Sequence, residues 1–158
     1  MDKRTDGVPA EEYLCTRIRR VEQALMNHHE AVLRGYGLTM TQYTVLLAIS
    51  REGGMSGAQL ARSAGVTQQT MAAVLSGLEA RQLITRQPSS VHAKVLISAL
   101  TEQGEEVLNR AYQEVNVLER AFADTFTPAE RTALCDLLDR ATTVLIAQTR
   151  RTGARTAD

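Results

Sequence analysis

The sequence predicts a mainly α-helical fold with one short β-ribbon, and three observations lead to it. Apolar residues recur at spacings of three and four through most of the 158-residue chain, which is the periodicity of amphipathic helices. Capping residues and a glycine divide residues 56–81 into two short helices with a tight turn between them. Two β-branched runs follow directly. Helix, turn, helix and ribbon is the order of a winged helix-turn-helix.

Two helices are expected before this central module. A polar leader over residues 1–8, which we expect to be flexible, precedes a helix that begins near Pro9 and ends at the glycines of residues 35–37. Thr39 then caps a second helix over residues 40–52, and two consecutive glycines end it.

Residues 56–81 carry the helix-turn-helix signal itself. Ser56 followed by Gln59 is a capping box. Gly65 can take the left-handed conformation that ends the first helix, and Thr67 can cap the second. In such a motif the second helix enters the major groove of DNA.

The second helix has two different faces. Its apolar stripe, which we expect to be buried, consists of Met71, Val74, Leu75 and Leu78. The predicted base-reading residues on the first turn and the opposite face are Thr67, Gln68, Gln69, Thr70, Ala73 and Ser76. Gln can bond adenine edges, hydroxyls can bond any base edge or phosphate, and Ala can contact the thymine methyl group. The alternative is an ordinary polar face, although this one presents small and amide side chains rather than charges.

Residues 83–100 predict a ribbon with strands over residues 83–87 and 93–100 and a turn between them. As a wing, the ribbon would contact phosphates or a minor groove. The residues expected to do so are Arg86, Ser89, Ser90, His92 and Lys94. The alternative is a hairpin that only packs on the core. We therefore define residues 38–100 as the predicted DNA-binding module.

Two further helices follow the ribbon. Thr101 caps the first, and the capping box Thr127-Pro-Ala-Glu130 begins the second, which we expect to end near Gln148. A module of this size does not need these helices for its own core, so residues 9–37 and 101–148 are expected to form the helical dimerisation region of a homodimer. The leucines expected at its interface are Leu118, Leu134, Leu138 and Leu145. The alternative is a monomer whose helices close over its own module.

The charged, glycine-bearing segment 149–158 is predicted to be a flexible tail. No run of about 18 apolar residues and no charged-then-apolar leader is present, so we expect a cytoplasmic protein without a membrane span. The formal net charge is zero, which argues mildly against DNA binding, although a neutral total can contain a local basic face. Without a phosphate loop, a catalytic Ser/His/Asp set or a metal motif, neither an enzyme nor a cofactor is expected.

Four short segments together resemble the multiple-antibiotic-resistance regulator (MarR) family of bacterial transcription factors, over roughly residues 10–148. They are Leu38-Thr-Met-Thr-Gln-Tyr-Thr-Val-Leu-Leu, Gln59-Leu-Ala, Leu78-Glu-Ala-Arg-Gln-Leu-Ile-Thr-Arg and Leu100-Thr-Glu-Gln-Gly. The resemblance implies an obligate dimer that binds a pseudo-palindromic operator and usually represses transcription until a small molecule or an oxidant releases it. A winged-helix module that binds other proteins, without specific DNA binding, is the remaining alternative.

Three positions depart from the family pattern. His92 and Lys94 stand where the family wing commonly reads Asp-x-Arg, and Lys lacks the two-pronged fork of Arg. Ser76-Gly77 stands where the family often has a basic residue. Gly at this position costs about 0.8–1 kcal/mol of helix propensity relative to Ala, and close approach of another backbone would be a reason to have it there. Gln82 replaces the Gly that usually closes the recognition helix.

The resemblance also implies where a signal is sensed. The family binds aromatic carboxylates and drugs between the dimer helices and the DNA module, and the matching candidates are Arg17, Met26, His29, Tyr36 and Tyr43. In the peroxide-sensing branch a reactive Cys lies in the first helix, as Cys15 does here, and Cys135 can resolve it across the dimer. A metal site at His28-His29 is not expected. Consecutive side chains on a helix point about 100° apart, so the two histidines cannot both bind one ion comfortably.

Overall fold

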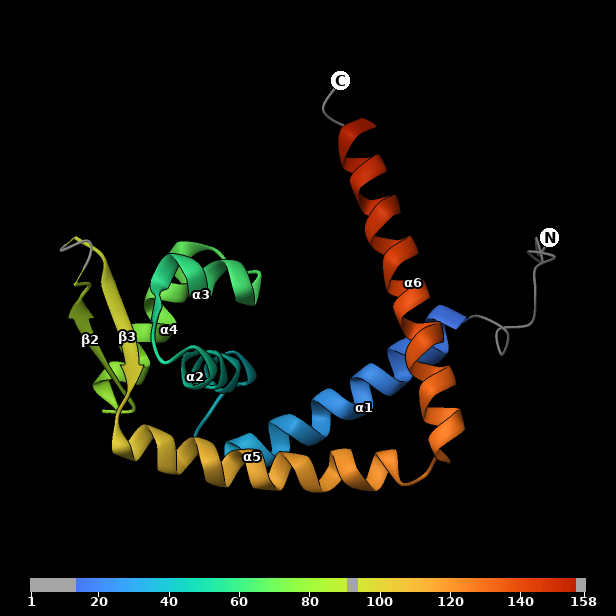
Figure 1. The fold of residues 1–158 in the computed structure, drawn as a ribbon, viewed down its shortest axis with the longest axis horizontal. Helices are drawn as coiled ribbons and strands as arrows, with labels where there is room; N and C mark the ends of the chain where they lie inside the picture. The colour runs from blue at the N-terminus through green and yellow to red at the C-terminus, as the bar shows by residue number, and fades with distance from the viewer. Residues whose placement is uncertain (1–13, 91–93, 156–158) are drawn as a thin grey trace, which may run out of the picture. The chain divides into compact units, whose positions relative to one another are not determined.

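The computed structural model describes residues 14–90 and 94–155 (Figure 1). Its elements are α1 (Leu14–Arg34), α2 (Met40–Glu52), β1 (Met55–Ser56), α3 (Gly57–Ala64), α4 (Gln68–Ala80), β2 (Ile84–Pro88), β3 (Leu96–Leu100), α5 (Glu102–Ala123) and α6 (Pro128–Arg155). This mainly helical order confirms the predicted fold class. The chain divides after Val115 into two compact units.

The predicted starts of α2 and α3 are confirmed by their hydrogen bonds. The hydroxyl of Thr39 accepts from the backbone N–H of Gln42 at 3.2 Å, and the Gln42 side chain accepts from the N–H of Thr39 at 3.0 Å. Ser56 and Gln59 make the same reciprocal pair at 3.3 and 2.9 Å. Each capping box satisfies two N–H groups that a helix start leaves without a partner. Local sequence therefore determines where both helices begin.

The sheet has three strands, in the order β1-β3-β2, and both pairings are antiparallel. The sequence predicted only two of these strands. It missed β1, which has only two residues and is too short to show an alternating pattern. The second strand begins at Leu96 rather than at residue 93. Pro88 is accommodated at the end of β2, since β2 is an edge strand and needs no further ladder partner.

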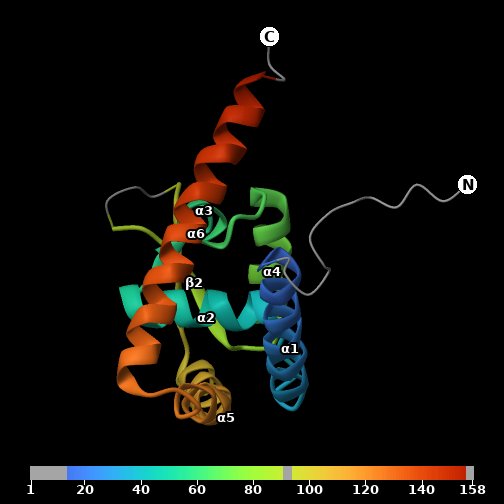
Figure 2. The same cartoon turned by 90° about the vertical axis from the view of Figure 1, so that its right-hand side faces the viewer.

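A continuous apolar core joins the helix-turn-helix, the sheet, the end of α1 and the first half of α5. In both views α2 lies between α3 and α5 (Figure 1 and Figure 2). The largest side chains that are almost fully buried are Leu33, Leu46, Ile49, Leu60, Met71, Leu75, Leu78, Leu83 and Ile84. This core holds α4 against the rest of the module.

The second unit contains the end of α5 and all of α6. The predicted capping box is present: the backbone N–H and the hydroxyl of Thr127 both donate to the Glu130 carboxylate at 2.8 Å. Both hydrogen bonds lower the pKa of Glu130, and the bond from the backbone N–H has the larger effect. Helix α6 continues to Arg155, beyond the predicted end at Gln148; the added segment has no proline and only one glycine, which costs about 1 kcal/mol. Within the described residues, no helix is long and apolar enough to cross a membrane.

Candidate DNA-binding surface

Helix α4 presents the predicted reading face to solvent. Met71, Leu75 and Leu78 are at most 1% exposed, and Val74 is half-buried, so the apolar stripe faces the core as predicted. The side chains on the first turn and the opposite face are all exposed: Thr67, Gln68, Gln69, Thr70, Ala73 and Ser76. The packing of one stripe therefore fixes which face is available to a partner.

The N-terminus of α4 is capped by Thr67, whose hydroxyl accepts from the backbone N–H of Thr70 at 3.1 Å. The hydroxyls of Thr67 and Thr70 also lie 2.8 Å apart, within hydrogen-bond distance. The exposed amides of Gln68 and Gln69 stand beside this cap. A helix N-terminus attracts phosphate, so the first turn combines a phosphate-binding end with side chains that can bond base edges.

The C-terminus of α4 ends in a Schellman motif built on a glutamine. The N–H of Gln82 donates to the carbonyl of Glu79 at 2.8 Å, and that of Leu83 donates to the carbonyl of Leu78 at 3.0 Å. Gln82 has a φ of 58°, a left-handed conformation that costs an L-residue about 1–2 kcal/mol. The departure from Gly at this position thus leaves the motif intact and adds strain.

Helix α5 is attached to this end of α4. The hydroxyl of Thr101 donates to the carbonyl of Gln82 at 2.6 Å and caps α5 by accepting from the N–H of Gly104 at 2.9 Å. The N–H of Thr101 donates to the carbonyl of Leu83 at 3.2 Å. A Cβ on Gly104 would overlap the Leu83 carbonyl oxygen, so no larger residue fits there. The sequence showed Gly104 only as part of a family motif and gave no sign of this contact.

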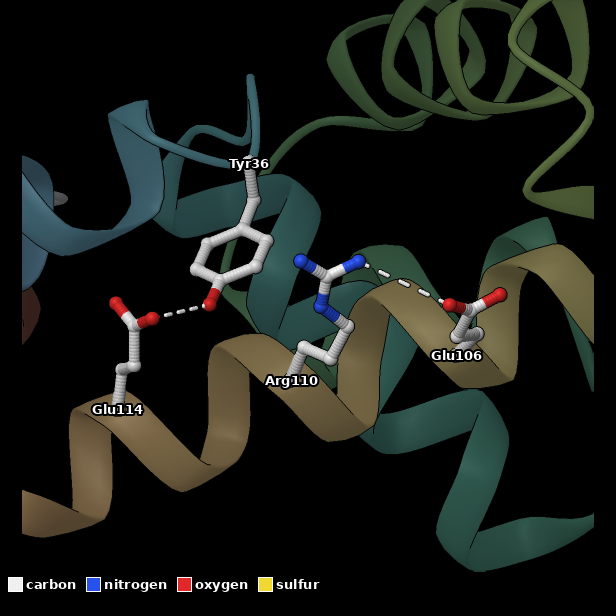
Figure 3. A network of polar contacts seen from close by, with 4 residues as sticks. All are labelled: Tyr36, Glu106, Arg110 and Glu114. Atoms are coloured by element: carbon white, nitrogen blue, oxygen red, sulfur yellow. Dashed lines mark hydrogen bonds and ion pairs between the residues drawn. The ribbon is translucent and has the colours of Figure 1, made fainter.

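Arg81 connects the same end of α4 to the loop between α1 and α2. Its two terminal nitrogens donate to the carbonyls of Gly37 at 2.6 Å and Tyr36 at 3.0 Å. The Tyr36 hydroxyl in turn donates to the Glu114 carboxylate on α5 at 2.6 Å (Figure 3). The pKa of Tyr36 is raised above its ordinary value, mainly because of this hydrogen bond to Glu114. One turn of α5 before Glu114, the guanidinium of Arg110 lies 3.8 Å from the carboxylate of Glu106 (Figure 3).

The wing residues divide between two environments. Arg86 lies on the same face of β2 as buried Ile84, and its guanidinium is 3.9 Å from the Glu79 carboxylate on α4. This contact braces the wing against α4, with the Arg86 side chain only 24% exposed. The predicted contacts Ser90 and Lys94 are exposed and Ser89 is half-buried. His92 lies outside the described residues.

The structure separates the predicted ligand residues. Tyr43 is 6% exposed and belongs to the core, whereas Arg17 is exposed near the start of α1. Met26 and His29 are half-buried one turn apart on α1. Both ring nitrogens of His29 are buried, and neither has a hydrogen-bond partner within the described part of the chain. Of the five residues, His29 therefore has the largest unmet need for a polar partner.

The predicted redox residues, Cys15 and Cys135, are free thiols on exposed parts of α1 and α6. Among the residues that the structure describes, no group of three or more His, Cys, Asp or Glu side chains is placed to hold a metal ion.

Comparison with known proteins gives consistent matches. Residues 36–94 match the family model described as the MarR family. The HTH-type transcriptional repressor Rv2887 of Mycobacterium tuberculosis is 34% identical over 113 residues, which span 71% of this chain and 81% of that protein.

Two solved structures show the same fold. The transcriptional repressor CouR bound to a 23-mer DNA duplex is 25% identical, with a TM-score of 0.74 over 84% of this chain and 94% of that chain. NadR in complex with 4-hydroxyphenylacetate is 20% identical, with a TM-score of 0.68 over 89% of this chain and 97% of that chain.

Proposed function

This chain belongs to the MarR family of transcriptional repressors, and we propose that it is a cytoplasmic homodimer that binds a pseudo-palindromic operator and releases it on binding a small aromatic ligand. The observation that carries the proposal is α4. Its apolar stripe is almost fully buried, while its capped N-terminus and the uncharged face beside it are exposed. Such a face can enter a major groove without a charge penalty. CouR, which shares the fold, is bound to DNA in its structure.

Direct base contacts are assigned to Gln69 and its neighbours on α4, and backbone contacts to the wing. Lys94 and Ser90 are exposed and suited to phosphates. Arg86 takes part less directly, because its ion pair with Glu79 holds the wing beside α4. Exposed Lys94 and the N-terminus of α4 supply local positive charge in a chain without net charge.

The second part of the proposal is the dimer. Large apolar side chains that are 40–74% exposed lie on α1, α5 and α6: Leu14, Ile18, Val21, Tyr112, Val117, Phe122, Leu137, Leu138, Val144, Leu145 and Ile146. Leu118 and Leu134 are half-buried. Exposed apolar surface of this extent favours a second copy that covers it. Two recognition helices held by such a dimer reach half-sites about 34–36 Å apart.

The ligand is proposed to bind beside His29. Its two buried ring nitrogens lack partners among the described residues, and a carboxylate or phenol supplies the acceptor or donor that they need. Met26 offers an apolar contact one turn away. NadR, a protein of the same fold, holds 4-hydroxyphenylacetate, which combines both groups. Tyr36 and Arg17 are further candidates, whereas buried Tyr43 can only form part of a wall.

Titration of a labelled promoter duplex at two salt concentrations, with competitor DNA, tests DNA binding. Specific binding with a steep salt slope supports a repressor, and its absence supports a protein-interaction module. Gln69→Ala should reduce the preference for operator over scrambled DNA by about 1–3 kcal/mol. Gln113→Ala, the same change at an exposed site on α5, should leave that preference unchanged. Equal effects of the two variants would exclude base reading by Gln69.

A second mode of release is oxidation of Cys15, which is favoured by the exposure of both thiols to oxidants. Under this mode, Cys15→Ser abolishes peroxide-induced release from DNA, and Cys135→Ser alters the oxidised product. Binding by the reduced protein stays the same in both variants. A peroxide response equal to that of the parent in both variants would exclude thiol sensing.

A further inference from the structure

The end of the recognition helix is fixed by polar contacts as well as by packing. The apolar stripe of α4 holds the helix in the core, but apolar contacts are non-directional and permit small rotations. Arg81, the residue that follows the last turn, donates to two backbone carbonyls at once, those of Tyr36 and Gly37. A planar guanidinium that bonds two acceptors has geometric specificity that a point charge lacks.

The two carbonyls bound by Arg81 belong to the end of α1. There the N–H of Leu38 donates to the carbonyl of Leu33 at 3.0 Å, and Gly37 has a φ of 62°, which together form the C-terminal cap of α1. A cation at this end also matches the negative end of the helix dipole. The Arg81 contact therefore links the last turn of α4 directly to the last turn of α1.

The same loop is tied to α5 through a side chain. The Tyr36 hydroxyl donates to Glu114 (Figure 3). The Tyr36 carbonyl accepts from Arg81, so one residue joins α4 to α5. Both contacts lie within the first compact unit. We call the set Arg81, Tyr36, Gly37 and Glu114 the α4 latch. It connects the proposed DNA-reading helix to the two helices of this unit that carry exposed apolar residues, α1 and α5.

We propose that Arg81 is a positioning residue that sets which half-site spacing the dimer accepts. This inference rests on the proposed function, because the spacing between two recognition helices exists only in a dimer. When α4 is held at a fixed angle to α1 and α5, the helices through which two copies meet, the separation of the two reading helices is fixed as well. Without the latch, α4 keeps its buried stripe and its reading face but adopts a wider range of angles.

The test compares four variants, Arg81→Lys, Arg81→Gln, Tyr36→Phe and Arg51→Gln, on three kinds of duplex. The duplexes are the palindromic operator selected from a random pool, the same half-sites with one base pair inserted between them, and a single half-site. Arg81→Lys keeps the charge but loses the two-pronged fork. Tyr36→Phe removes only the hydroxyl that bonds Glu114. Arg51→Gln, at an exposed arginine in the last turn of α2, is the control for loss of one positive charge, matched to Arg81→Gln.

We expect the parent to prefer the native spacing strongly. Arg81→Lys and Arg81→Gln should reduce that preference about fivefold or more, a typical coupling between linked sites, and leave half-site affinity nearly unchanged. Tyr36→Phe should shift the preference in the same direction by less. Arg51→Gln should leave it as in the parent, and thermal unfolding verifies that each variant is folded.

Three outcomes overturn the inference. A spacing preference that stays at the parental value in folded Arg81→Lys shows that the fork does not position α4. A half-site affinity that falls as much as operator affinity shows that Arg81 acts on DNA or on folding instead. An equal loss of preference in Arg51→Gln assigns the effect to charge. If the parent binds no duplex specifically, the proposed function fails first, and the two failures are thereby distinguished.

Discussion

Residues 33–115 and residues 116–149 of this chain place their apolar side chains in opposite environments. Every fully buried apolar residue that the structure describes lies in the first segment, where the helix-turn-helix, the sheet and the start of α5 share one core. In the second segment none of the described side chains is buried, and leucines such as Leu137 and Leu145 are 57% and 59% exposed.

The comparison shows that the two regions are stabilised by different means. The first segment buries its own apolar stripe, so its fold depends on the fit of residues within one chain. The second has exposed apolar residues on its helices, and in the proposed dimer a second copy covers them. Variants in the two regions should therefore fail in different ways.

The largest effect is expected from Leu138→Asp. An unpaired carboxylate in the proposed interface costs on the order of several kcal/mol, so the dimer should dissociate and operator affinity should fall with it. Light scattering and DNA titration measure both. Thr143→Asp, at an exposed site about 140° around α6 from Leu138, is the matched control and should leave both unchanged. A parent that is monomeric at micromolar concentration and still binds a palindrome tightly would contradict the proposed dimer.

Gly104→Ala should destabilise the first segment, residues 33–115. Its new methyl group would overlap the Leu83 carbonyl oxygen and lie 2.9 Å from the carbonyl carbon, so α5 must move away from the end of α4. Overpacking of this kind costs about 1–3 kcal/mol. Urea unfolding should show the loss as a lower midpoint. An unchanged midpoint would mean that the start of α5 is not held against Leu83.

Gly77→Ala lies in the same segment but should stabilise it. A Cβ at Gly77 would lie 3.8 Å from the Gln42 side-chain nitrogen, an ordinary contact, so close approach within the chain does not require glycine there. Alanine should stabilise the module by about 0.8–1 kcal/mol through helix propensity. Urea unfolding measures this too. A loss of DNA affinity without a loss of stability would assign the glycine to approach of the DNA backbone.

Gln82→Gly tests the strain at the end of α4. Glycine accepts the left-handed conformation without the cost of about 1–2 kcal/mol that Gln carries there, although it gains more entropy on unfolding. The net gain should be about 0.5 kcal/mol, seen as a small rise in the unfolding midpoint. Gln103→Gly, within the first turn of α5, should instead destabilise. A destabilised Gln82→Gly would show that the Gln side chain contributes a contact that offsets its strain.

The smallest effect concerns Glu130 in the second region. Its pKa is lowered by the bonds from the Thr127 backbone and hydroxyl, so its contribution is present above the ordinary value of 4.5 and is lost as pH falls through the lowered value. Glu130→Gln should remove this pH dependence of unfolding below pH 4.5. Glu119→Gln, an exposed change of the same charge, should retain it. Identical pH profiles for parent and Glu130→Gln would exclude the effect.

Much of the module could be predicted because its signals are local. The caps at Thr39 and Ser56 join residues three apart, and the α4 stripe follows from helix periodicity alone. The exposed face of α4 then follows from the buried one. The prediction failed where the local signal was weak: strand β1 has only two residues, too few to show an alternating pattern.

The sequence by itself determined where α2, α3 and α6 begin, the order of the winged helix-turn-helix and which face of α4 is exposed, because each depends on residues within about two turns of one another. Only the tertiary structure decided that Arg86 turns toward Glu79 and that Gly104 lies against Leu83. It alone placed Arg81 on the end of α1, 44 and 45 residues away, and Tyr36 on Glu114, 78 residues away. Such contacts form only when packing brings distant segments together, and no spacing along the chain encodes them.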